Sequence, residues 1–373
     1  MIDRAVRPEV RSMERPRHGG DVWDDLDVKD YSSNVNPFGP PPRLERYIVE
    51  AASELHCYPD DSCARLKGAI AARYGVDDSN VIVGAGSAEL IRLFAEVFIS
   101  PGDRVVMPSP TFSEYAFGCR LMGARLIDHV LPHEEDFALD VAELAARLDG
   151  AKAVYVCNPN NPTGRMVNRS DLLDLVAEAA RKETLVFLDE TLLELSSRSD
   201  ELSLVPEVES HENLFIIRSF TKSFAMPGLR IGYGFGPRRL LNYLEAGRLT
   251  WNLGTIEQRV ATRLMEEEQE HVARAATMIE GEKRRMHARA EKLMGRVPMP
   301  DSYFFFAPLD ALDVSSAEFR RHMLRHGVLV RDCSSFGGVC SGYTRFCVKT
   351  PEKNDEFLDA LSRAVADISE GRS

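Results

Sequence analysis

The sequence of 373 residues has no C-x-x-C pair, no long apolar run and no excess of positive charge. Its cysteines number seven, which is odd, so neither a disulfide framework nor a zinc ribbon is favoured, and we expect reduced thiols. No apolar run approaches the roughly 20 residues that cross a bilayer. Lys and Arg number 46 against 58 for Asp and Glu, and the net charge of −12 disfavours a broad surface for nucleic acid or an anionic membrane. An anionic ligand would therefore need a local pocket.

The N-terminal segment is charged and has no apolar core, unlike a secretory signal, so a cytoplasmic protein is expected. The chain is 44% hydrophobic and 28% charged, which is typical of a globular protein rather than a disordered or fibrous one. At roughly 100–200 residues per domain, its length predicts two or three domains.

Composition divides the chain into three parts. Residues 1–45 are rich in Pro, Arg and Gly and predict an arm laid over the small domain and the ligand site. Residues 46–245 alternate short apolar runs with helical patterns and predict a large domain. Residues 246–373 begin with a stretch without proline that predicts long helices, and then return to shorter elements, so a smaller α+β domain is expected.

The apolar runs of the large domain are short and rich in β-branched residues, as in buried strands. Helical patterns lie between several of them, notably at 87–98 and 169–182. Strands that alternate with helices predict a mainly parallel sheet covered on both faces, which is the α/β class. The expected strands lie at 81–84, 104–107, 125–130, 153–157, 184–189 and 214–219.

Five of these runs are followed by side chains that suit a single ligand. In an open α/β sheet, ligands bind beyond the carboxyl ends of the strands, so these groups are expected to meet. They supply a glycine turn, an aromatic ring, an amide, a carboxylate and a lysine, at Gly86, Phe112, Asn161, Asp189 and Lys222. Taken singly, each has a simpler explanation, such as a tight turn, a core ring or a helix cap.

Lys222 has apolar and hydroxyl neighbours, and such a lysine loses its proton readily and forms a Schiff base. Ser219, Thr221 and Arg230 around it suit a phosphate. Asp189 ends an apolar strand and needs a partner, for which a protonated pyridine nitrogen is one candidate.

The other strand ends complete the description of the ligand. Gly86, Ser87 and Ala88 open a helix whose bare N–H groups suit an anion. Asn161 is placed to donate to a phenolic oxygen, and Phe112 to stack on a flat ring. Together these groups describe pyridoxal 5′-phosphate (PLP). Two other motifs are incomplete: a G-x-G-x-x-G fingerprint with Glu89 as its last residue, and an S-x-x-K motif without its companion triplets.

With these residues in hand, the chain resembles the fold-type I PLP enzymes of aminotransferase class I/II over about residues 18 to 365. The motifs NPNNPTG, LDE, and SFTK with GLRIGYG carry the resemblance in order and spacing. It implies that Lys222 binds the cofactor covalently, that Asp189 holds the pyridine nitrogen, and that Asn161 holds the phenolic oxygen. It also implies that Tyr58, in a Tyr-Pro-Asp turn, reaches the phosphate of a partner subunit, and hence a homodimer with shared sites. The implied ring and phosphate contacts are Phe112, Gly86, Ser87, Ser219 and Arg230.

Two subgroups of this family are similar in length and take phosphorylated substrates: histidinol-phosphate aminotransferases and the threonine-phosphate decarboxylases of cobalamin biosynthesis. Residues 18–20, 31–41 and 328–354 look more like the decarboxylases. That likeness implies that His18 and Arg331 contact the substrate phosphate. Arg345 would bind the α-carboxylate by a bidentate pair, and Asn34 would line the substrate side.

The hypothesis from sequence is decarboxylation of L-threonine O-3-phosphate to 1-amino-2-propanol phosphate. The first alternative is an aminotransferase acting on histidinol phosphate, or a similar phosphorylated amine, with glutamate and 2-oxoglutarate. The second is a non-catalytic protein with the same fold, which the presence of Lys222 and Asp189 disfavours. One departure from the family pattern is Leu192, where related aminotransferases often have a tyrosine that donates to the ring oxygen.

Overall fold

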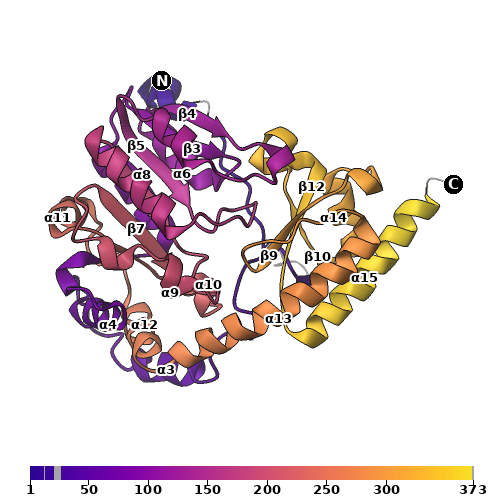
Figure 1. Ribbon diagram of the computed structural model, residues 1–373. Helices are drawn as coiled ribbons and strands as arrows, with labels where there is room; N and C mark the ends of the chain where they lie inside the picture. The colour runs from indigo at the N-terminus through magenta and orange to yellow at the C-terminus, as the bar shows by residue number, and fades with distance from the viewer. Residues whose placement is uncertain (12, 21–26, 372–373) are drawn as a thin grey trace.

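The six strands expected in the large domain all form, and they lie in one seven-stranded sheet. The computed structural model describes residues 1–11, 13–20 and 27–371. Figure 1 shows this sheet with its helices as one part of the molecule, and a smaller sheet with α14 (Ser316–Arg325) and α15 (Pro351–Glu370) as the other. No helix in the described ranges is long and apolar enough to span a membrane.

The large sheet has the strand order β2-β8-β7-β6-β5-β3-β4, and neighbouring strands from β7 to β4 are parallel. This arrangement confirms the predicted α/β class. Its strands are β2 (Val81–Gly84), β3 (Arg104–Ser109), β4 (Arg125–Val130), β5 (Ala151–Cys157), β6 (Leu185–Asp189), β7 (Leu214–Ser219) and β8 (Gly232–Phe235).

β8 was not predicted, because its sequence GYGF has glycine at two of four positions and glycine is disfavoured in strands. The strand runs antiparallel to both β2 and β7. Its glycines allow close backbone packing: a Cβ on Gly232 would lie 2.3 Å from the backbone nitrogen of Ser87, and one on Gly234 would lie 2.9 Å from the Ile216 oxygen. β8 therefore supports the turn that precedes α5.

Alternate side chains of the sheet enter two separate cores, one on each face. Phe215 and Ile217 of β7 pack with helices α5, α6 and α11, whereas Leu214 and Ile216 pack with α7 and α8 on the other face. The helices that cover the sheet are α4 (Ala64–Tyr74), α5 (Ser87–Phe98), α6 (Ser113–Leu121), α7 (Val141–Ala146), α8 (Arg169–Arg181) and α11 (Arg238–Gly247). The short helices α9 (Ser199–Leu202) and α10 (Phe220–Ser223) follow β6 and β7 in the chain.

The stretch without proline forms long helices as predicted. α12 (Thr255–Glu267) packs on α3 (Leu44–Ala52) and on α4. α13 (Gln269–Met294) extends towards the smaller sheet and packs on α15. The domain boundary expected at residue 246 stays a prediction, and the packing of α12 groups this helix with the large part of the molecule.

The small part contains an antiparallel sheet of β11 (Arg331–Asp332), β12 (Tyr343–Cys347) and β9 (Phe304–Pro308). The N-terminal segment joins it, because β1 (Lys29–Asp30) pairs in parallel with β10 (Val328–Leu329). The chain before it contacts the large part instead: α1 (Ile2–Ala5) and α2 (Pro8–Arg11) lie near α6, and Arg7 Nη2 donates to the Leu121 oxygen over 2.5 Å. The arm thus contacts both parts.

Candidate active site

Asp189 ends β6 and is buried, and each of its carboxylate oxygens has a hydrogen-bond donor. The Tyr115 hydroxyl donates to Oδ2 over 2.6 Å, and the Thr191 backbone N–H donates to Oδ1 over 2.8 Å. Burial raises the pKa of Asp189 and also that of the Tyr115 phenol, which therefore stays a donor. Both donors are neutral, so a cationic ring nitrogen would be the missing counter-charge for this carboxylate.

Lys222 lies in α10, directly after β7. Ser219 is the N-cap of this short helix, and its hydroxyl accepts a hydrogen bond from the Thr221 N–H over 3.2 Å. Burial lowers the pKa of Lys222 to about 8, and the charges of Arg345 and Arg230 lower it in the same direction. A much larger fraction of this amine is therefore neutral near pH 7 than for a solvated lysine, as a nucleophilic lysine requires.

The turn that opens α5 is suited to an anion. Gly86 is the N-cap with φ +81°, and no side chain of the described residues caps the helix, so the N–H groups of its first turn, at Ser87 and Ala88, can donate to a ligand. The Arg230 guanidinium lies against this turn, because a Cβ on Gly86 would come within 2.5 Å of Arg230 Nη2. A helix N-terminus beside a guanidinium fits the phosphate of PLP.

Asn161 lies in the loop after β5 and is joined to the small sheet by Arg345. Arg345 Nη1 donates to Asn161 Oδ1, and Arg345 Nη2 donates to the Ser32 backbone oxygen over 2.5 Å. The amide oxygen is therefore occupied, and the amide NH₂ of Asn161 remains as the donor that a phenolic ring oxygen would need.

Arg331 and Arg345 lie opposite each other on β11 and β12, and both are buried. Arg331 Nη2 donates to the Ser335 hydroxyl and to the Arg17 backbone oxygen, each over 2.7 Å, while the buried Arg345 Nε has no hydrogen-bond partner among the described residues. Burial and the Arg345 charge lower the pKa of Arg331 to about 10. Within the described ranges neither guanidinium forms an ion pair with a carboxylate, so the pair is suited to anionic partners.

The arm brings two further predicted residues to this region. His18 Nε2 lies 2.7 Å from Glu114 Oε1, and the His18 ring centroid lies 5.8 Å from that of Phe112. Asn34 is buried, and its side-chain oxygen Oδ1 has no hydrogen-bond partner in the part of the chain that the structure describes. Such an orphaned polar atom suits a position that lines a ligand.

Two further positions from the sequence analysis are Tyr58, expected to act at a partner's site, and Leu192, the departure from the family pattern. The Tyr58 side chain is 79% exposed and stacks on Trp251 with ring centroids 4.4 Å apart, so it is presented on the surface. Leu192 is buried in the hydrophobic core.

Sequence reasoning missed two residues of the site, Tyr115 and Glu114. Both lie in the first turn of α6, directly after Phe112, which is the N-cap of that helix. The only sequence signal is their position after the strand end of β3, and a tyrosine in such a helix more often belongs to the core.

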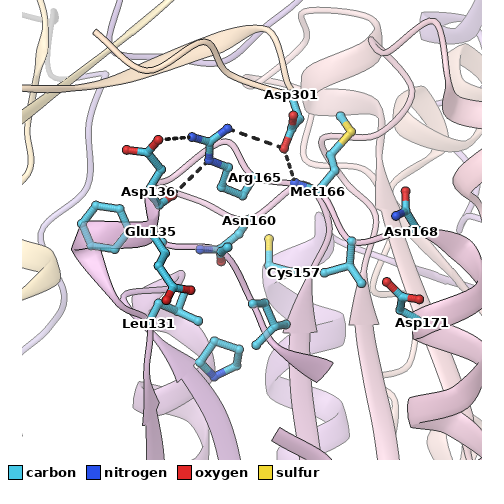
Figure 2. Close-up of a pocket in the computed structure, with 15 residues that line it drawn as sticks. Leu131, Glu135, Asp136, Cys157, Asn160, Arg165, Met166, Asn168, Asp171 and Asp301 are labelled. Atoms are coloured by element: carbon cyan, nitrogen blue, oxygen red, sulfur yellow. Dashed lines mark hydrogen bonds and ion pairs between the residues drawn. The ribbon is translucent and has the colours of Figure 1, made fainter. Parts of the chain in front are cut away.

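Figure 2 shows a cavity beside the loop that follows β5. Cys157 and Asn160 are among its lining residues, and its volume is about 390 Å³. Arg165 lies on one side of the cavity, where its Nη2 is 3.0 Å from Asp136 Oδ2 and its Nη1 is 3.9 Å from Asp301 Oδ2. None of the predicted site residues lines this cavity, although Cys157 pairs with Asp189 in the sheet and Asn160 precedes Asn161.

Comparisons with known proteins identify the family. The family described as "Aminotransferase class I and II" matches residues 27–361. A Symbiobacterium thermophilum protein named histidinol-phosphate aminotransferase is 34% identical over 373 residues, covering 97% of this chain and 99% of its own. A Caldanaerobacter subterraneus protein, provisionally named threonine-phosphate decarboxylase, is 32% identical over 354 residues, which is 95% of each chain.

Solved structures give the same answer for the fold. The histidinol-phosphate aminotransferase of Clostridium acetobutylicum has a TM-score of 0.84 at 27% identity and covers 91% of this chain and 100% of its own. That of Sinorhizobium meliloti, solved in complex with PLP, has a TM-score of 0.85 at 22% identity, covering 97% and 98%, and shares the fold. The chain therefore belongs to the aminotransferase class I and II family, and it is an enzyme whose cofactor is PLP.

Proposed function

We propose that this enzyme decarboxylates L-threonine O-3-phosphate to 1-amino-2-propanol phosphate. The observation that carries the proposal is the pair of buried guanidinium groups, Arg331 and Arg345, which have no acidic partner in the described part of the chain. Two such cations on one face suit a substrate with two anionic groups, here a carboxylate and a phosphate.

Each residue has a defined part in the proposal. PLP, when bound, supplies an electron sink for the bond that breaks at the substrate α-carbon. Asp189 would hold the proton on the ring nitrogen, and Asn161 would donate to the ring oxygen. Arg345 would orient the substrate carboxylate, and Lys222, with its lowered pKa, would return a proton to the α-carbon after CO₂ leaves.

The substrate phosphate would be bound by Arg331, with His18 and Asn34 from the arm completing that side. Within the described ranges, both hydrogen bonds of the Arg331 side chain come from Nη2, so Nη1 and Nε can each donate to a phosphate oxygen.

The second candidate is an aminotransferase that acts on histidinol phosphate or a similar amine with glutamate. The 34% identity to a relative so named favours it. Leu192, which is buried in the core, disfavours the aminotransferase, because leucine cannot provide a second hydrogen-bond donor to the ring oxygen.

A homodimer with shared sites is part of the proposal. Tyr58 supports it, because this ring is exposed and stacks on Trp251, which leaves its hydroxyl free to reach a partner. A cytoplasmic location and a place in cobalamin biosynthesis likewise stay predictions.

The test is CO₂ release from purified PLP-loaded protein given phosphothreonine and no keto acid. We expect many turnovers of CO₂ with one equivalent of 1-amino-2-propanol phosphate for each. Stoichiometric conversion of the cofactor to its pyridoxamine form without CO₂, followed by turnover with histidinol phosphate and 2-oxoglutarate, would contradict decarboxylation and establish the second candidate.

A further inference from the structure

The first turn of α6 contacts both the cofactor residues and the arm. Tyr115 donates to Asp189, and the neighbouring Glu114 lies 2.7 Å from His18, whose ring lies 5.8 Å from that of Phe112. The first turn of α6 therefore contacts both Asp189, expected at the cofactor ring, and His18, expected at the substrate phosphate.

The arm is held at both ends of this helix. Arg7 donates to the Leu121 oxygen in the last turn of α6, and His18 pairs with Glu114 in the first turn. Between α6 and the small sheet, the Arg17 oxygen accepts a hydrogen bond from Arg331 over 2.7 Å.

The arm then passes close over Arg331. A Cβ on Gly19 would lie 3.3 Å from Arg331 Cδ and equally close to the Ser32 hydroxyl, and the Gly20 N–H donates to that hydroxyl over 3.0 Å. The backbone on both sides of His18 therefore lies against Arg331, while the His18 ring contacts Glu114 and Phe112.

We propose that Glu114 is a positioning residue that holds His18, and with it the arm, over the anion bound by Arg331. This rests on the proposed function. The contact with Glu114 is at Nε2, and within the described ranges no hydrogen bond reaches Nδ1. When the ring carries both protons, Nδ1–H is free to donate to an anion while Nε2–H is held by the carboxylate.

Glu114 also carries a negative charge that repels a phosphate, so the two effects of this side chain have opposite signs. The Glu114 side chain is only 23% exposed and is engaged by His18, whose side chain is 47% exposed. The proposal is that holding His18 outweighs the repulsion. Because exposed ion pairs contribute up to about 1 kcal/mol, losing this pair should weaken phosphate binding by about fivefold.

The test compares Glu114→Ala, Glu114→Asp and a matched control, Glu96→Ala, on PLP-loaded protein. Glu96 forms an exposed ion pair of similar length with Arg92 on α5, at 2.6 Å, and within the described ranges it forms no hydrogen bond or ion pair with the arm. Calorimetry would give the affinities for phosphothreonine and for inorganic phosphate, steady-state assays would separate KM from kcat, and trypsin would report cleavage at Arg17.

For Glu114→Ala we expect about fivefold weaker binding of both anions, a matching rise in KM, little change in kcat, and faster cleavage at Arg17. Glu114→Asp should recover part of the affinity, and Glu96→Ala should bind both anions as wild type does. The double variant with Glu114→Ala and His18→Ala should bind them no more weakly than His18→Ala alone. Unchanged or tighter anion binding by Glu114→Ala, or a wild-type protein that binds neither anion, would overturn the inference. Weaker binding by Glu114→Ala in a protein that releases no CO₂ would support the inference and contradict the proposed function.

Discussion

Asp189, at the carboxyl end of β6 in the large sheet, accepts a hydrogen bond at each carboxylate oxygen. Arg331 and Arg345 on the small sheet have no acidic partner in the described part of the chain. We call the first region the cofactor half, with Phe112, Asn161, Asp189, Lys222 and the turn at Gly86, and the second the substrate half, with Arg331, Arg345, His18 and Asn34. Asp189 of the cofactor half is held by hydrogen bonds from neighbouring protein groups, whereas the two guanidinium groups of the proposed substrate half would gain their counter-charges from a bound substrate. Changes in the cofactor half should therefore lower kcat, and changes in the substrate half should raise KM.

The largest effect is expected for Lys222→Ala in the cofactor half. We expect kcat to fall by at least about 10³-fold, because the amine that bonds the cofactor and moves a proton is lost. Borohydride should fix PLP to the wild-type chain and not to the variant. Lys182→Ala, which removes a surface lysine paired with Asp149, is the control and should keep its activity. Substantial turnover by Lys222→Ala would contradict this assignment.

Asp189→Asn should lower kcat by about 10²-fold or more, because the negative charge that holds the ring proton is lost. Tyr115→Phe removes one neutral hydrogen bond to the same carboxylate and should cost about tenfold or less. Both should leave the KM for phosphothreonine nearly unchanged when kcat and KM are measured together. A Tyr115→Phe defect as large as that of Asp189→Asn would show that the tyrosine has a role of its own.

In the substrate half, Arg331→Ala should raise the KM for phosphothreonine by about 10–100-fold, the range for losing hydrogen bonds to a charged group. The affinity for PLP should change little, as cofactor titration would show. Ser335→Ala, which removes only one hydrogen bond of Arg331, should have a smaller effect in the same direction. An unchanged KM would rule out a phosphate at Arg331.

The smallest effect concerns stability and pH. Below about pH 8, Lys222 is charged in both the folded and the unfolded chain, so its burial penalty is fully present in the cofactor-free protein. Between about pH 8 and the model-compound value of 10.5, the folded chain loses this proton first, and the penalty disappears as pH rises. Lys222→Met should therefore be more stable than wild type by about 2–3 kcal/mol near pH 7, with the difference shrinking towards pH 10. Urea unfolding of both cofactor-free proteins at several pH values would measure it, and a constant difference would contradict the burial argument.

The cofactor half was largely predictable from sequence, because its residues follow strands whose carboxyl ends must meet in a parallel sheet. Asp189, Ser219 and Lys222 lie where the strand pattern places them. β8 escaped prediction because its glycines serve close packing against Ser87, which no local pattern reveals. Glu114 and Tyr115 escaped because their partners, His18 and Asp189, lie more than 70 positions away in the chain.

The residues of the substrate half were predicted from the resemblance to a known family and not from the pattern of strands and helices. The register that sets Arg331 beside Arg345, and the contact of Arg331 with the backbone of Arg17, depend on tertiary packing. The same resemblance predicts that Tyr58 reaches the phosphate in a partner subunit, and with its ring exposed that role stays a prediction.

The central claim, that the substrate half selects a substrate with both a carboxylate and a phosphate, is tested most directly by one ratio. This is kcat/KM for CO₂ release from phosphothreonine divided by that from threonine, measured in wild type and in Arg331→Ala without any keto acid. We predict a ratio of at least about 10-fold in wild type that falls towards one in the variant, because the phosphate contact alone is lost. A wild-type ratio near one, or no CO₂ from either amino acid, would contradict the account.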